Sequence, residues 1–145
     1  MILATTLASA MVSSSFAFLH STWGRPADPR IRVYRDIGAW LRSHTLPQSR
    51  VAAVEIGALA YFSDRPVLDL AGLIDPELRT ARHEGRLRAA VDAERFDYLV
   101  WNSAFDGNFL AQLATSRALE LDYRRVATFS RPEYPRTIQL LQRKR

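Results

Sequence analysis

The pattern of apolar and polar positions divides the chain near residue 24. The first 24 residues, "MILATTLASAMVSSSFAFLHSTWG", carry no charged side chain before Arg25. As a helix, the stretch from Ile2 to Trp23 would be about 33 Å long, enough to cross the hydrocarbon core of a bilayer. The pattern predicts an apolar helix at residues 1–24, the last transmembrane span of a longer protein, followed by a soluble domain at residues 25–145.

Two other interpretations of the first segment stay open. A cleaved signal peptide would offer small residues such as "ASA", but "MILATT" lacks the basic start that such peptides have. A buried N-terminal helix of a soluble protein is the second. The membrane interpretation is favoured because Ser and Thr are tolerated in membrane helices and because His20 and Trp23 fall where an interfacial belt belongs.

After residue 25 the pattern first predicts a helix. Asp28 followed by Pro29 is typical of a helix start, and apolar residues then recur at helical spacing: Val33, Ile37, Trp40 and Leu41. "HTLPQS" ends this helix. Two short strands follow, "RVAAVEIG" and "PVLDL", joined by a turn in which Asp64 and Arg65 form a solvated pair. Their connection is short for a parallel crossover, so their relative direction stays open.

The second half predicts further alternation of helix and strand. Asp75 and Pro76 begin a charged helical stretch broken at Gly85, and "FDYLVWN" is a strand buried on both faces. "SAFDGNFLAQLATSRALE" has helical spacing, and "YRRVATFS" with "RTIQLLQR" form a β-ribbon at the sheet edge. The order predicts an α/β fold, a three-layer sandwich with a mixed, mainly parallel sheet, preceded by the apolar helix.

Composition narrows the chemistry. The chain has no cysteine, and its three histidines are scattered, so we expect neither thiolate chemistry nor a metal site. The net charge of +5 comes almost wholly from arginines that alternate with acids, so no nucleic acid partner is expected. Nucleophile-elbow, phosphate-loop and dinucleotide motifs are absent, and no cofactor is predicted.

Carboxylates are the remaining candidates for a site. Glu55 and Asp69 end the first two predicted strands, and α/β sheets place ligands at such ends, so the two could face one crevice. The alternative is structural, since a carboxylate in these positions commonly accepts hydrogen bonds from loop N–H groups or caps a helix. Asn102 is interpreted as a turn residue.

A family resemblance rests on "YRDIGAWLRSHTLPQSRVAAVEIGALAYFSDRPVLDLAGLIDPE", which begins at Tyr34. This stretch resembles the extracytoplasmic C-terminal region of polytopic bacterial GT-C class glycosyltransferases, of the arabinofuranosyltransferase-like or mannosyltransferase-like kind. Asp69, Gly72 and Asp75 match its "Val-x-Asp-x-x-Gly-Leu" segment and the Asp-Pro that follows, so with Glu55 they are the binding candidates.

The resemblance implies a noncatalytic domain of a cell-membrane protein, lying on the extracytoplasmic side. The parent protein would use a polyprenyl-phosphate sugar donor and a glycan acceptor, and the domain would shape the acceptor side or stabilise the membrane-embedded catalytic part. The catalytic acid of such enzymes belongs to an early loop between membrane helices, so no catalytic residue can be assigned in this chain.

Two other functions remain open from the residues alone. One is a self-contained small α/β enzyme or ligand-binding module with a carboxylate site. The other is an interaction domain anchored to a membrane by a single span.

Overall fold

The computed structural model describes residues 13–15, 17–19, 28–105, 113 and 121–144. Its helices are α2 (Pro29–His44), α3 (Gly57–Ser63), α4 (Pro76–His83), α5 (Leu87–Glu94) and the 3-10 turn η1 (Ser103–Phe105). Its strands are β1 (Val51–Ala53), β2 (Val67–Asp69), β3 (Tyr98–Asn102), β4 (Tyr123–Arg131) and β5 (Tyr134–Arg143).

Two sequence predictions fall largely outside these residues. Most of the apolar helix expected at residues 1–24 is not described, and within the described parts of the chain no helix has the length and apolar character needed to span a bilayer. The helix expected after Ser103 is described only at η1 and at Leu113.

Helix α2 forms as its sequence predicts. The Asp28 side chain accepts a hydrogen bond from the Arg30 N–H at the first turn, and Pro29 occupies a position that has no N–H to satisfy. Apolar residues at helical spacing make one face of the helix buried.

The C-terminal end of α2 binds Arg65, which the sequence predicted to form a solvated pair with Asp64. That prediction is wrong, because Arg65 is only 9% exposed and its guanidinium donates to the Arg42 and Thr45 carbonyls, each at 2.9 Å.

The sheet is mixed, in the order β2-β1-β3-β5-β4. β1 pairs in parallel with both β2 and β3, which settles the direction of the first two strands, and α3 is the short crossover between them. β3–β5 and β5–β4 are antiparallel pairs. The expected edge ribbon is therefore present, but the sheet is only partly parallel, since this ribbon contributes both antiparallel pairings.

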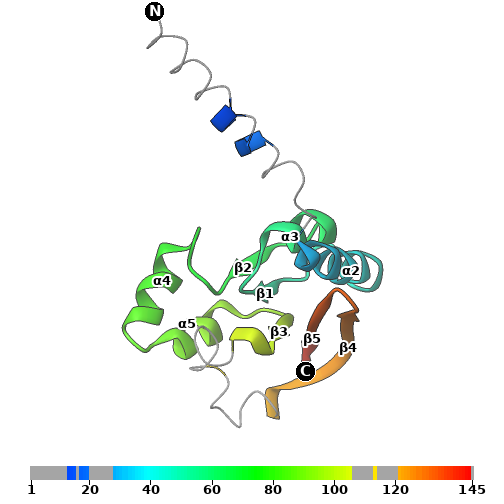
Figure 1. The fold of residues 1–145 in the computed structure, drawn as a ribbon. Coiled ribbons are helices and arrows are strands. Elements are labelled where there is room, and N and C mark those ends of the chain that lie inside the picture. Colours follow the sequence, from blue (N-terminus) through cyan, green and yellow to red (C-terminus); the bar gives the residue numbers. More distant parts are fainter. Residues whose placement is uncertain (1–12, 16, 20–27, 106–112, 114–120, 145) are drawn as a thin grey trace, which may run out of the picture.

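Helices cover both faces of the sheet (Figure 1), α2 and α3 on one face and α4 and α5 on the other. The side chains of β1 alternate between these faces: Val51 and Ala53 pack with α2 and α3, and Ala52 packs toward α4 and α5. All three are fully buried. This two-sided burial is why the central strands read as continuous apolar runs.

Helices α2 and α3 touch at Gly38. A Cβ at this position would lie 2.8 Å from the Phe62 Cβ and 2.9 Å from the Ser63 backbone nitrogen. No flexible side-chain end is there to move aside, so the two helices pack this closely only with glycine at the contact.

We predict that Gly38→Ala lowers the free energy of unfolding by about 1 kcal/mol, because overpacking costs about 1–3 kcal/mol and the better helix propensity of alanine returns about 1 kcal/mol. Urea unfolding measures the change. Gly57→Ala is the matched control, since nothing lies within 4 Å of a Cβ there. Equal stability of the two variants would contradict the close helix contact.

Candidate functional site

The parallel strands end at one edge of the sheet, which we call the carboxyl edge and define by Glu55, residues 69–75 and Asn102. β1 pairs in parallel with both β2 and β3, so the residues that follow each of the three strands share this edge. α/β proteins usually bind ligands at such an edge. All four candidates from the sequence lie here, but they do not form one cluster.

Asp69 has both carboxylate oxygens engaged by its own loop. It is 1% exposed, and its Oδ1 and Oδ2 accept hydrogen bonds from the Ala71 and Ile74 backbone N–H groups, each at 2.9 Å. This is the structural alternative weighed from the sequence. Asp69 thus organises the loop rather than facing Glu55 across an open crevice.

Gly72 and Asp75 complete the same loop. Gly72 has a φ of +71°, and a Cβ there would lie 2.6 Å from the Arg79 Cα, so only glycine fits the turn against α4. The Asp75 side chain accepts from the Glu77 and Leu78 N–H groups, both at 3.0 Å, and so caps α4. The motif residues therefore build one fixed loop.

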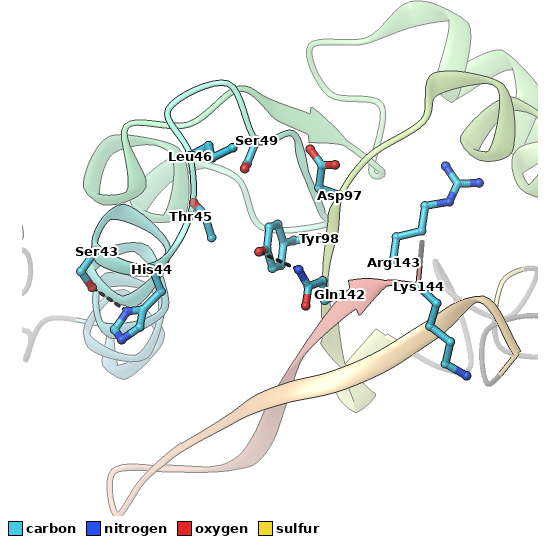
Figure 2. Close-up of a pocket in the computed structure, with 10 residues that line it drawn as sticks. All are labelled: Ser43, His44, Thr45, Leu46, Ser49, Asp97, Tyr98, Gln142, Arg143 and Lys144. Atoms are coloured by element: carbon cyan, nitrogen blue, oxygen red, sulfur yellow. Dashed lines mark hydrogen bonds between the residues drawn. The ribbon is translucent and has the colours of Figure 1, made fainter.

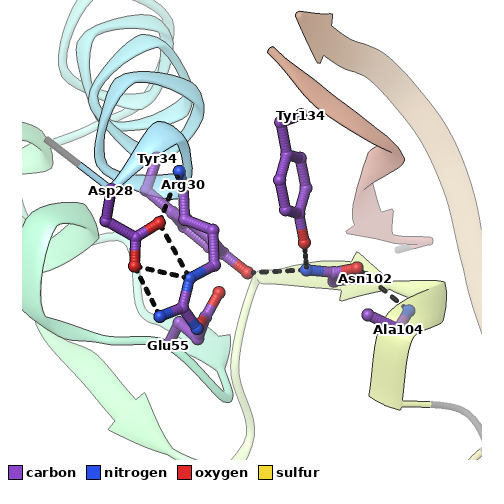
Figure 3. Close-up of polar contacts among 7 residues, drawn as sticks. All are labelled: Asp28, Arg30, Tyr34, Glu55, Asn102, Ala104 and Tyr134. Atoms are coloured by element: carbon purple, nitrogen blue, oxygen red, sulfur yellow. Dashed lines mark hydrogen bonds and ion pairs between the residues drawn. The ribbon is translucent and has the colours of Figure 1, made fainter. Parts of the chain in front are cut away.

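Glu55 lies in a charged cluster beside the start of α2 (Figure 3). One of its oxygens pairs with the Arg30 guanidinium, which also donates to both oxygens of Asp28. The Asp28 hydrogen bond, with the Glu55 charge, raises the pKa of Arg30 above its ordinary value. The other oxygen, Oε2, is buried, and the Glu55 carboxylate interacts with the Tyr34 hydroxyl, which adds to the effect of burial in raising the pKa of that tyrosine.

Asn102 joins two tyrosines next to this cluster (Figure 3). It is 1% exposed, and its Nδ2 donates to the hydroxyls of Tyr34 at 3.2 Å and Tyr134 at 3.0 Å, while its Oδ1 accepts from the Ala104 N–H at 3.0 Å. Burial raises the pKa of Tyr34; the Asn102 hydrogen bond opposes this rise and the Glu55 charge adds to it.

Sequence reasoning missed this network because it interpreted Asn102 as a turn residue. The available signal was the position of a polar side chain at the end of a strand buried on both faces, "YLVWN". Neither tyrosine carried a comparable local signal, since each comes from an element distant in sequence.

The cluster suits a hydrogen-bond donor. Asp28 and Glu55 share the single guanidinium of Arg30, and a buried carboxylate oxygen without a donor is costly. The Tyr34 hydroxyl accepts from Asn102 and keeps its own hydrogen, so it can supply this donor from within the protein. Within the described residues no group of three or more His, Cys, Asp or Glu could hold a metal ion.

A pocket of about 410 Å³ lies at the opposite edge, between the end of α2 and the last residues of β5 (Figure 2). Several of its polar groups already have internal partners. His44 Nδ1 lies 2.9 Å from the Trp40 carbonyl, Asp97 accepts from the Arg50 N–H at 2.9 Å, and the Tyr98 hydroxyl accepts from Gln142 at 3.1 Å. These contacts give the pocket wall a structural role.

We predict that Asp69→Ala lowers the free energy of unfolding by about 2–4 kcal/mol, because it leaves two N–H donors of the loop without acceptors. Asp75→Ala, which removes only a helix cap, should cost about 1 kcal/mol. Thermal or urea unfolding measures both. A loss at Asp69 no larger than that at Asp75 would contradict the structural role of Asp69.

Comparisons with known proteins bear on the family and not on the activity. Residues 24–142 match the family described as "Domain of unknown function (DUF8728)". No curated protein and no solved structure matches the chain. The match covers most of the sequence, so the chain belongs to this family of domains of unknown function.

Proposed function

We propose that the chain is a noncatalytic extracytoplasmic domain of a membrane glycosyltransferase that uses a polyprenyl-phosphate sugar donor. The domain would shape the acceptor side of the enzyme or stabilise its membrane-embedded catalytic part. In this proposal the cell membrane, the donor and the glycan acceptor are its partners through the parent protein.

The observation that carries the proposal is where the domain begins. At the start of α2, Arg30 forms hydrogen bonds with both Asp28 and Glu55. The chain therefore enters the domain at its carboxyl edge. The stretch from Trp23 to Asp28 can reach at most about 18 Å. If residues 2–23 span a bilayer, this edge lies close to the membrane surface, where lipid-linked donors are found.

The carboxylates support a noncatalytic role. Acid–base catalysis by a pair would need Glu55 and Asp69 to converge on one substrate position. Asp69 instead uses both oxygens within its loop, and Asp75 caps a helix. The motif that carries the glycosyltransferase resemblance builds a loop, which supports a role in shaping a surface.

The reading frame upstream of Met1 tests this proposal directly. We expect it to continue in phase and to encode several hydrophobic spans, because polytopic glycosyltransferases place such a domain after their membrane helices. Sequencing the genomic DNA provides the measurement. One upstream span or none would count against a polytopic parent, and a frame that leaves residues 1–24 as the single span would favour a membrane-anchored interaction domain.

An activity assay is the complementary control. The 145-residue chain, mixed with a polyprenyl-phosphate sugar and a glycan acceptor, should transfer no sugar. Transfer by this chain alone would show that it is catalytic and would exclude the proposal.

A ligand-binding module is the second candidate, favoured by the charged cluster of Asp28, Arg30 and Glu55 at the carboxyl edge. It predicts measurable heat when the chain is titrated with methyl glycosides, and loss of that heat in Glu55→Gln. Glu133→Gln is the matched control, because Glu133 also pairs with an arginine of α2, Arg32 at 3.4 Å. Absence of heat with every probe would rule this candidate out, and so would equal loss in the two variants.

A further inference from the structure

The loop after β2 displays two adjacent apolar side chains to solvent. Leu73 is 77% exposed and Ile74 is 72% exposed. Apolar residues in a free loop usually fold back onto the protein, since burial of each removes apolar surface from water. In this loop, contacts of Asp69, Gly72 and Asp75 hold the backbone so that Leu73 and Ile74 both stay exposed.

The shape of the loop is fixed at three points. Asp69 accepts the Ile74 N–H, Gly72 adopts a positive φ against the backbone of Arg79, and Asp75 caps the next helix. These three motif residues are engaged within the protein, so they are not available for catalysis or for contact with a ligand. Their common effect is to hold Leu73 and Ile74 at the tip.

The loop lies beside the point where the chain enters the domain. The Leu70 N–H donates to the Ala53 carbonyl at 2.9 Å, which ties the start of the loop to the end of β1. Glu55, two residues further on, pairs with Arg30 in the first turn of α2. Ile31, also in that turn, is 49% exposed. Exposed apolar side chains therefore occur on two elements at this edge.

A cation accompanies the apolar tip. Arg79 is exposed on α4, and its backbone contacts Gly72. The acids Asp75 and Glu77 lie at the start of the same helix, so both signs of charge occur beside the tip. An exposed apolar pair with an arginine on the supporting helix suits the boundary between acyl chains and phosphate headgroups, where apolar groups insert and arginine meets phosphate.

We propose that the carboxyl edge rests on a lipid bilayer, with Leu73 and Ile74 inserted at the headgroup boundary and Arg79 facing lipid phosphates. This inference relies on the proposed function only for the membrane attachment of residues 1–24. A protein partner fits less well, because a stable protein interface buries about 800 Å² on each side. Two side chains at a loop tip provide only a small part of that area.

Single labelled cysteines test the inference, because the chain contains no native cysteine. The full chain carrying Leu73→Cys, labelled with an environment-sensitive fluorophore, would be reconstituted in vesicles of phosphatidylcholine and phosphatidylglycerol. We expect a blue shift and a severalfold loss of emission when lipids carrying an acyl-chain quencher are included. Leu46→Cys is the matched control: Leu46 is an exposed leucine (59%) beyond the end of α2, away from this edge.

The outcomes separate the inference from the proposed function. Strong quenching at position 73 with little at position 46 supports the inference. A second label at Ile31→Cys should also be quenched, and adding Leu73→Glu and Ile74→Glu to that variant should remove the quenching. Equal quenching at positions 73 and 46, or none at either while the chain still floats with vesicles, overturns the inference and leaves membrane attachment standing. A chain that does not float with vesicles overturns both.

Discussion

Parallel pairing of β1 with β2 and β3 is the constraint on which the rest of the structure depends. It sends the residues after all three strands to one edge, and it requires helices on both faces because the central strands are buried on both sides. Glu55, the 69–75 loop and Asn102 meet at this edge for that reason alone. Since α2 also begins there, the same edge receives the chain from its apolar N-terminal segment.

The motif formed by Asp69, Gly72 and Asp75 gains a physical meaning from this arrangement. Asp69 and Gly72 are buried or tightly packed, and Asp75 is engaged as a helix cap, so none of the three is free for chemistry. Their combined effect is a rigid loop that exposes Leu73 and Ile74. A carboxylate-rich motif can thus fix the shape of a loop through hydrogen bonds within the chain.

Local chemistry made part of this fold predictable from the sequence. Asp28 and Asp75 each precede a proline, and both cap helices as predicted, because the hydrogen bonds of a cap join neighbouring residues. Contacts between distant residues were not predictable. Arg65 binds the carbonyl of Thr45, twenty residues earlier, and Asn102 binds tyrosines from two other elements. Such partners are fixed by the pairing of the sheet, which one sequence does not reveal.

A carboxyl edge that rests on a membrane, as we propose, would shield position 73 from water. Alkylation by a water-soluble maleimide, at single cysteines placed at positions 73 and 46 of the full chain, tests it most directly. Vesicles should slow the reaction at position 73 and leave the rate at position 46 unchanged, because Leu46 lies away from that edge. If vesicles leave the reaction rate at position 73 unchanged, as at position 46, the carboxyl edge does not contact the membrane.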